Sequence, residues 1–311
     1  MSPSSLPSPP ARTGAIALLL LAAACGAPSA GRGEERAVDA AAAANALLPA
    51  PPESLVREPA LLASVRRGRA ILAATGDSLP DHVGNALRCT SCHLDDGRRA
   101  GALPWVGVYA AFPQYRSREA AVLRLEDRIN GCLLRSMNGR ALPLDHPAMR
   151  DMVAYMAHLS RGVAVGDTVI GRGMPRIPEP AAVDTAEGRR VYAAECARCH
   201  GADGEGGPLG PPVWGDRSFN VGAGMARLRT AASFIHANMP RDRPGTLGEQ
   251  AAYDVAAFLV ARPRPDLARK HLDWPNGDAP PDAAYETDGR RRRVRDSVAA
   301  QRSSIAAETR K

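Results

Sequence analysis

Two pentapeptides of the form Cys-x-x-Cys-His are the strongest constraint on how this chain can fold. One is CTSCH, from Cys89 to His93, and the other is CARCH, from Cys196 to His200. The pattern is typical of covalent haem c attachment, in which both thiols bond to the porphyrin and the histidine supplies an axial nitrogen to iron. The competing interpretations are a redox dithiol, a zinc site and structural disulfides. A redox dithiol would not need the histidine, and a zinc site would need its four ligands close together. The sequence therefore predicts two covalently bound haem c groups, held by Cys89, Cys92 and His93 and by Cys196, Cys199 and His200.

Apolar residues at helical spacing surround each motif and predict an all-α fold. Helices are expected near residues 61–76, 118–138, 147–160, 185–196, 228–238 and 247–261. No alternating strand pattern of useful length is present. Aromatic residues make up only 4% of the chain, too few to fill two small cores, so something other than side chains should occupy each centre. We expect two class I cytochrome c-like haem domains joined by a Gly/Pro-rich linker.

Composition divides the chain into seven segments. A run of about ten apolar residues ends at Ala24; it is too short to span a bilayer and suits a signal peptide, which predicts export to the periplasm. The expected segments are a signal peptide (1–25), a flexible tether (26–58), an N-terminal haem domain (59–165), the linker (166–183), a C-terminal haem domain (184–264), an extended wrap segment (265–288) and a basic disordered tail (289–311).

Cys25 closes the signal segment and leaves two interpretations open. Cleavage before Cys25 would resemble bacterial lipoprotein processing and would give the protein a lipid anchor, whereas an ordinary cut near Ala-x-Ala would not.

Net charge is concentrated at the other end of the chain. The segment 289–311 has eight basic and two acidic residues, which account for +6 of the total +7. The haem-bearing body is therefore close to neutral, and no nucleic-acid partner is expected.

Cys132 lies outside both haem-attachment motifs, so its function must be sought elsewhere. Arg128, Cys132 and Ser136 recur every fourth residue along one expected helix face. Positive charge beside a thiol favours the thiolate, which is the form that attacks sulfur and binds iron. The alternative interpretation is a buried apolar cysteine.

Equal spacings suggest the sixth ligand of each iron. Cys132 lies 39 residues after His93, and Met239 lies 39 residues after His200. Met225 is the alternative in the second domain. A thiolate donates more charge to iron than a thioether, so a His/Cys haem should have the lower potential. Electrons should then enter at the first domain and leave through the second. The alternatives in the first domain are Met137, Met149, Met152 and Met156, of which the last three have core spacing.

Three runs of sequence resemble the dihaem thiosulfate dehydrogenases that form tetrathionate. They are LEDRINGCLLRSMNGRAL (125–142), SFNVGAGMARLRTAASFIHANMP (218–240) and DWPNGDAPPDAAY (273–285). The resemblance covers about residues 61–285, and the first domain of that family is in turn similar to the thiosulfate-handling cytochromes of the sulfur-oxidation system. It implies that Cys132 is the distal ligand of the first haem, in the active site, and that Arg118, Arg128 and Ser136 line the substrate pocket.

The resemblance also implies a reaction and a second ligand pair. Two thiosulfates would couple to tetrathionate at the first haem, through a transient sulfur adduct on Cys132. Electrons would pass by a His/Met haem to a soluble or membrane-bound acceptor, either a cytochrome c or an oxidase. Some family members have a lysine that competes for the second iron; position 238 is Asn238 here, so no such switching is expected.

The substrate implied by the resemblance agrees with the chemistry of these side chains. Guanidinium groups suit the sulfonate end of thiosulfate, and a soft thiolate suits its sulfane sulfur. The alternative is a dihaem electron-transfer cytochrome without substrate chemistry, which would have methionine at both irons and no anion pocket. Thiosulfate oxidation and tetrathionate reduction would use the same site, so the direction stays open.

Overall fold

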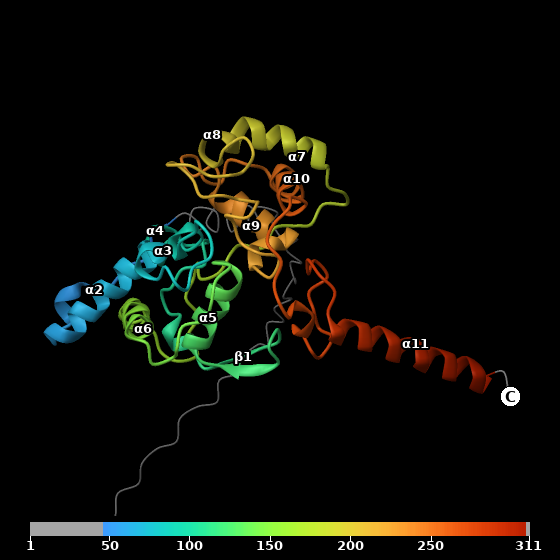
Figure 1. The fold of residues 1–311 in the computed structure, drawn as a ribbon, viewed down its shortest axis with the longest axis horizontal. Coiled ribbons are helices and arrows are strands. Elements are labelled where there is room, and N and C mark those ends of the chain that lie inside the picture. The colour runs from blue at the N-terminus through green and yellow to red at the C-terminus, as the bar shows by residue number, and fades with distance from the viewer. Residues whose placement is uncertain (1–45, 309–311) are drawn as a thin grey trace, which may run out of the picture.

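The computed structural model describes residues 46–308, with side chains placed as far as Gln301. Two helical domains lie against each other, and a last helix projects away from both (Figure 1). Among residues 46–308, no helix is both long and apolar enough to cross a membrane. The predicted signal peptide, Cys25 and the first part of the tether lie outside the described residues.

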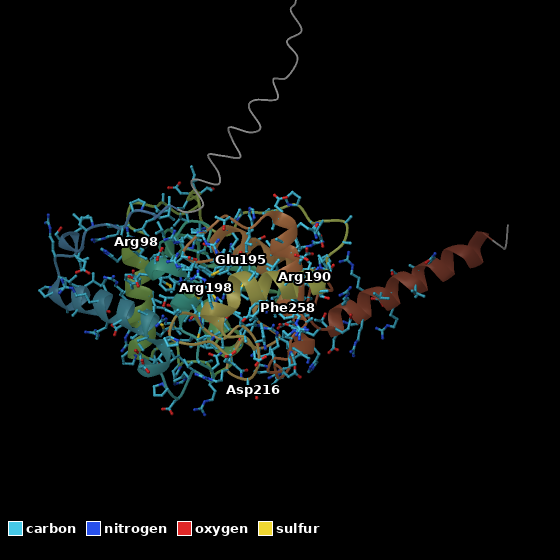
Figure 2. The ribbon with its side chains drawn as sticks, turned by 90° about the horizontal axis from the view of Figure 1, so that it is seen from above. Arg98, Arg190, Glu195, Arg198, Asp216 and Phe258 are labelled. Atoms are coloured by element: carbon cyan, nitrogen blue, oxygen red, sulfur yellow. The ribbon has the colours of Figure 1, made fainter. Side chains whose placement is uncertain are left out.

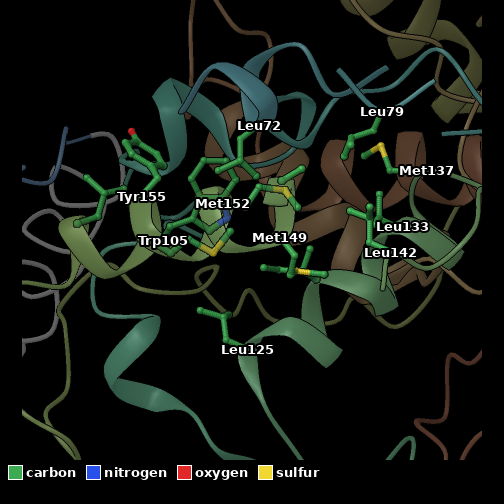
Figure 3. Close-up of a cluster of buried hydrophobic side chains, with 14 of the residues drawn as sticks. Leu72, Leu79, Trp105, Leu125, Leu133, Met137, Leu142, Met149, Met152 and Tyr155 are labelled. Carbon is green, nitrogen blue, oxygen red and sulfur yellow. The ribbon is translucent and has the colours of Figure 1, made fainter. Parts of the chain in front are cut away.

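The N-terminal domain is built on the crossing of two long helices, α2 (Pro59–Ala73) and α6 (Pro147–Leu159). Each begins with proline at a position where the missing N–H costs nothing, after a residue whose side chain accepts the backbone N–H two residues on. Their apolar faces meet α5 (Leu125–Arg135) in a buried cluster (Figure 3). The other helical elements are η1 (Glu53–Leu55), α3 (Thr75–Ser78), η2 (Cys89–Ser91), α4 (Leu94–Gly97), η3 (Tyr109–Ala111) and α5 (Leu125–Arg135).

The C-terminal domain repeats this plan with α7 (Thr185–Val191) crossing α10 (Glu249–Val260). Asp184 caps α7 by accepting the N–H groups of Ala186 and Glu187. The chain then passes through one π turn before the second haem motif, a local widening often found at functional sites. The remaining elements are this π turn η4 (Tyr192–Cys196), α8 (Ala197–His200), η5 (Gly224–Ala226) and α9 (Leu228–Asn238), the last with its predicted bounds.

In both domains the crossed helices meet at a glycine that lies directly against the backbone of the other helix. A Cβ atom on Gly68 would lie 1.9 Å from the backbone oxygen of Asp151, and one on Gly188 would lie 2.0 Å from that of Asp254. Only glycine lets the two helix backbones come this near. The prediction of two cytochrome c-like domains is confirmed at the level of helix packing.

The predicted all-α fold is confirmed, and the structure adds one small hairpin between the first haem motif and Cys132. The short strands β1 (Gln114–Arg116) and β2 (Ala121–Leu123) pair antiparallel, with Tyr115 opposite Val122. The predicted helix 118–138 is therefore wrong at its start, because the hairpin takes residues 118–123. The helix α5 begins only at Leu125, where Asp127 accepts the backbone N–H of Arg124 at 3.0 Å.

The predicted flexible tether and the predicted linker both pack on the domains. In the tether, Leu48 N–H donates to the carbonyl of Arg98 at 2.8 Å, and Val56 is buried. In the linker, Gly171 accepts the N–H of Gly101, and further along the linker Ile177 packs on the core of the C-terminal domain. The tether prediction is therefore wrong for residues 46–58.

The wrap segment 265–288 returns to the N-terminal domain, as its predicted extended form allows. Its one regular element is η6 (Lys270–Leu272). Trp274 is buried, and its N–H donates to the carbonyl of Arg118 at 2.7 Å.

The predicted disordered tail is wrong for most of its length. Residues Asp288–Glu308 form helix α11, which extends away from the body in both views (Figures 1 and 2). After Gly289 this segment contains no glycine or proline and is rich in arginine and alanine, which are strong helix formers. The charge that suggested disorder is carried by a helix.

Candidate haem sites and active site

A cavity of about 890 Å³ contains the second haem motif and extends to Cys92 of the first. Its walls include Cys196, Cys199 and His200. The Nδ1 atom of His200 lies 2.7 Å from the carbonyl oxygen of Pro211. Because a carbonyl oxygen can only accept, Nδ1 carries the proton and donates it. The other ring nitrogen, Nε2, is thereby left as the basic atom that can bind iron. Both thiols and a correctly oriented histidine therefore fit a covalent haem in this cavity.

The first haem motif has the same local arrangement. The Nδ1 atom of His93 donates to the carbonyl of Leu103 at 2.5 Å, and the ring stacks on Trp105 with centroids 5.0 Å apart. Cys89 accepts a hydrogen bond from Thr75 at 3.3 Å. None of the five described cysteines is in a disulfide. These residues fit a second covalent haem, and no disulfide competes for their sulfurs within residues 46–308.

Both methionines proposed for the second iron line the cavity. Met225 and Met239 each lie on its wall, so the cavity itself does not choose between them. Asn238, directly before Met239, is fully buried and donates to the carbonyl of Gly101 in the other domain at 3.1 Å. Asn238, which stands where some family members are expected to have a lysine, thus joins the two domains. The four methionines of the first domain considered as ligands, Met137, Met149, Met152 and Met156, all lie in the buried cluster.

Cys132 lies on α5 with Arg128 one turn before it and Ser136 at the end of the helix. The Nη1 atom of Arg128 donates to the Cys132 sulfur at 2.8 Å. Burial opposes ionisation of Cys132, but Arg128 and a hydrogen bond with His93 outweigh it and lower its pKa to about 6. By contrast, burial raises the pKa of the attachment thiols Cys89 and Cys92 to about 12. Cys132 is thus distinguished from the attachment cysteines of this domain, and His93 is among the groups that favour its thiolate.

Arg118 lies against the second domain and the wrap segment. Its Nη1 atom donates to the carbonyl of Gly222 at 2.6 Å and lies 3.7 Å from Asp273, and its guanidinium stacks over Trp274 at 4.3 Å. Burial, followed by the charge of Arg135, lowers the pKa of Arg118 to about 10. Its described contacts are therefore with the second domain and the wrap segment, rather than with Cys132.

Ser136 lies at the end of α5, one turn after Cys132. It is the residue that ends the helix, and its backbone carbonyl accepts a hydrogen bond from Asn85 at 2.8 Å. The same amide of Asn85 donates to the carbonyl of Ser218 at 3.0 Å, so this end of the helix is tied to the second domain.

Two further arginines near this site were missed by the sequence analysis. Arg116, on β1, has its pKa lowered by burial and then by the charge of Arg128, and the charge of Cys132 opposes this. Arg227, from the second domain, lowers the pKa of both Arg116 and Arg118. Its Nε atom is buried with no partner among the described residues. Arg116 could have been placed here only if the hairpin had been predicted. Arg227 could have been placed here only from the packing of the two domains.

Comparison with known families assigns both halves of the chain. A family model described as SoxA/TsdA, cytochrome c domain, matches residues 82–165. A model described as cytochrome c oxidase, cbb3-type, subunit III, matches residues 183–259. Each match falls on one of the two domains and includes its haem motif.

Individual relatives agree with these matches. The thiosulfate dehydrogenase of Allochromatium vinosum is 47% identical over 228 residues, covering 70% of this chain and 84% of that protein. That of Psychrobacter arcticus is 43% identical over 238 residues, covering 75% of this chain and 73% of that protein. The solved thiosulfate dehydrogenase (TsdBA) from Marichromatium purpuratum has a TM-score of 0.68 at 39% identity, and this chain spans 52% of that longer protein.

Proposed function

This chain belongs to the thiosulfate dehydrogenase family, and from that membership we propose that it oxidises two thiosulfate ions to one tetrathionate. A bond forms between the two sulfane sulfurs, and two electrons are released. The chain is an oxidoreductase with two covalently bound haem c groups, one in each cytochrome c domain. The observation that supports the location of the chemistry is the 2.8 Å contact between Arg128 and the Cys132 sulfur.

The chain's own residues divide the work at this site. When bound, the haems supply one-electron redox chemistry, on irons held by His93 and His200 with Cys132 and Met239 as the proposed distal ligands. The Arg128 guanidinium is planar and always charged, and it suits the sulfonate of a thiosulfate whose sulfane sulfur approaches Cys132. Arg118 and Ser136 are proposed to complete the wall of the pocket.

Cys132 also offers a balanced route for joining the two sulfurs. The sulfane sulfur of the first thiosulfate bonds to the Cys132 sulfur with loss of two electrons. The second thiosulfate then attacks that sulfane sulfur and displaces the Cys132 thiolate, which releases tetrathionate. Arg128 favours the thiolate at both the start and the end of this sequence.

The cellular setting is proposed on the sequence alone. The apolar segment before Ala24 supports a periplasmic location, with membrane attachment if Cys25 is lipidated. The electrons are proposed to leave through the C-terminal domain to a cytochrome c or an oxidase.

The decisive experiment replaces Cys132 while keeping both haems. In Cys132→Gly and Cys132→Met variants with two covalent haems, reduction of the haem absorption band by thiosulfate should be abolished. Leu134→Ala, on an exposed part of the same helix, serves as the control and should react normally. Full activity in both Cys132 variants would show that the sulfur takes no part in the reaction.

Spectroscopy separates this proposal from a dihaem electron carrier without substrate chemistry. The oxidised protein should give the near-infrared and EPR signature of a thiolate-ligated low-spin haem, and Cys132→Met should lose it. Methionine signatures at both haems of the unaltered protein would favour the carrier.

A further inference from the structure

One arginine of the second haem cavity has buried N–H groups with nothing to bind. Arg264 lines the cavity, and its Nε and Nη1 atoms are buried without a partner among the described residues. Its Nη2 atom donates to the carbonyl of Leu259 at 2.7 Å, and its guanidinium lies 4.4 Å from the Phe219 ring centroid. The hydrogen bond from Nη2 thus holds the side chain in place, while Nε and Nη1 have no described acceptor.

The position of Arg264 would be costly if the cavity supplied no counter-charge. Burial alone lowers its pKa to about 10, and no carboxylate contributes to the shift. A buried cation without a partner is destabilising, and so is each buried N–H that is left unbonded. An anion with two acceptor oxygens would satisfy both the charge and the two unbonded nitrogens.

The carboxylates on the cavity wall are engaged elsewhere. Asp95 pairs with Arg241, and Asp96 pairs with Arg69. Glu195, labelled in Figure 2, pairs with Arg243. Arg198, an arginine of the wall that the same figure labels, pairs with Asp242. Glu205 accepts the backbone N–H of Asp203. None of these acids reaches Arg264.

We infer that Arg264 binds a propionate carboxylate of the second haem. Haem c carries two such carboxylates, and a guanidinium presents its N–H groups in a fork that matches one of them. Two other arginines on the wall, Arg88 and Arg217, are exposed and can be solvated, so they do not need the carboxylate. The inference depends on the covalent haem of the C-terminal domain but not on thiosulfate chemistry.

A bound propionate gives Arg264 a role in setting the potential of the second haem. Reduction adds an electron near the site, and a buried positive charge favours the reduced form. Removing that charge, and leaving the propionate uncompensated, should favour the oxidised form. The charge and hydrogen bonding around a haem are among the protein's means of adjusting its potential.

The test is a redox titration of each haem in the dihaem protein. In Arg264→Gln, the ratio of reduced to oxidised second haem at a fixed electrode potential should fall about tenfold, equivalent to 59 mV for one electron. Arg264→Lys should restore most of the ratio, because it keeps the charge. The first haem should be unchanged. Arg262→Gln is the matched control, because Arg262 also stacks over a phenylalanine, Phe258, at 4.2 Å but does not line the cavity.

The outcomes separate this role from a structural one. An unchanged second-haem potential in Arg264→Gln, or equal shifts at both haems, overturns the inference. Loss of the second haem from Arg264→Gln but not from Arg264→Lys supports it, because charge then decides retention. Loss from both variants overturns it, because the shape of the side chain would then matter rather than its charge. Thiosulfate oxidation can fail or persist independently of all these results.

Discussion

The guanidinium of Arg128 donates to the sulfur of Cys132 at 2.8 Å, across one turn of α5. Residues four apart on a helix lie on the same face, so this contact follows from local sequence once the helix is known. His93, the proposed axial histidine of the first haem, also lowers the pKa of Cys132. An anion drawn to the arginine therefore arrives beside both the thiol and the haem attachment site.

Replacing Arg128 by glutamine should weaken thiosulfate turnover more than it alters the fold. A hydrogen bond to a charged group contributes about 1.5–3 kcal/mol, so kcat/KM should fall about 10- to 100-fold. Steady-state assays with a small artificial acceptor measure this. Arg124→Gln is the control, because Arg124 is exposed at the start of the same helix and pairs with Asp127. Equal losses in the two variants would contradict a specific role for Arg128.

The parts of this site that could be predicted from sequence are the local ones. The spacing of Arg128, Cys132 and Ser136 needs only a helix, and the haem motifs need only five consecutive residues. The neighbours of Arg118 and Arg227 depend on how two domains and a returning segment pack, and no pattern within either domain contains that information. The hairpin that carries Arg116 has strands of three residues, too short for a periodic signal.

Arg227 should strengthen substrate binding from the second domain. Its Nε atom is buried without a described partner, and its charge acts on Arg116 and Arg118. Arg227→Gln should raise the KM for thiosulfate about 3- to 10-fold, the equivalent of about 0.7–1.4 kcal/mol, with a smaller effect on kcat. Arg229→Gln, two residues on, is exposed and paired with Glu179 and should change neither constant. If Arg227→Gln has a normal KM for thiosulfate, then the unbonded Nε–H of Arg227 does not contact the substrate.

The helix crossings should tolerate no side chain at their closest points. Gly68→Ala and Gly188→Ala place a methyl group about 2 Å from a backbone oxygen, and such overpacking costs about 1–3 kcal/mol. Urea denaturation of the dihaem protein should show earlier unfolding for both. Gly76→Ala is the control, because nothing lies within 4 Å of its added Cβ. Destabilisation by Gly76→Ala alone would contradict this account of the packing.

Asp151 should make the N-terminal domain sensitive to acid. Burial opposes its ionisation, but hydrogen bonds from Arg67 at 2.8 Å and from Ser64 outweigh it and hold the pKa of this carboxyl below its usual range. A carboxyl with a lowered folded pKa stabilises the fold above its unfolded pKa of about 3.9, and this stability is lost as pH falls through the folded pKa.

The difference in the free energy of unfolding between the unaltered protein and Asp151→Asn should therefore be largest near neutral pH. It should shrink toward zero as pH falls below about 4, because the protonated carboxyl then resembles the amide. Urea midpoints measured across this pH range test the sign. Asp145→Asn, an exposed position before the same helix, should show no such trend, and a constant difference for Asp151→Asn would exclude this linkage.

The basic tail could be located from the sequence, but its attachment could not. Its charge is evident from composition, and helix α11 agrees with its arginine- and alanine-rich sequence. That the first turn of this helix packs on the wrap segment is a tertiary contact. Arg292 donates to the carbonyl of Pro275 at 3.0 Å, and Gly289 lies against the carbonyl of Trp274.

Two truncations should therefore behave differently. Ending the chain after Arg293 removes only exposed described residues and keeps the contacts to the wrap segment, so thiosulfate turnover with a small acceptor should be unchanged. Ending it after Thr287 removes the support for Trp274, which stacks over Arg118 at 4.3 Å. The KM for thiosulfate should then rise several-fold, and Trp274→Ala should raise it in the same way. Equal activity of the two truncated proteins would show that the wrap segment holds Arg118 without help from α11.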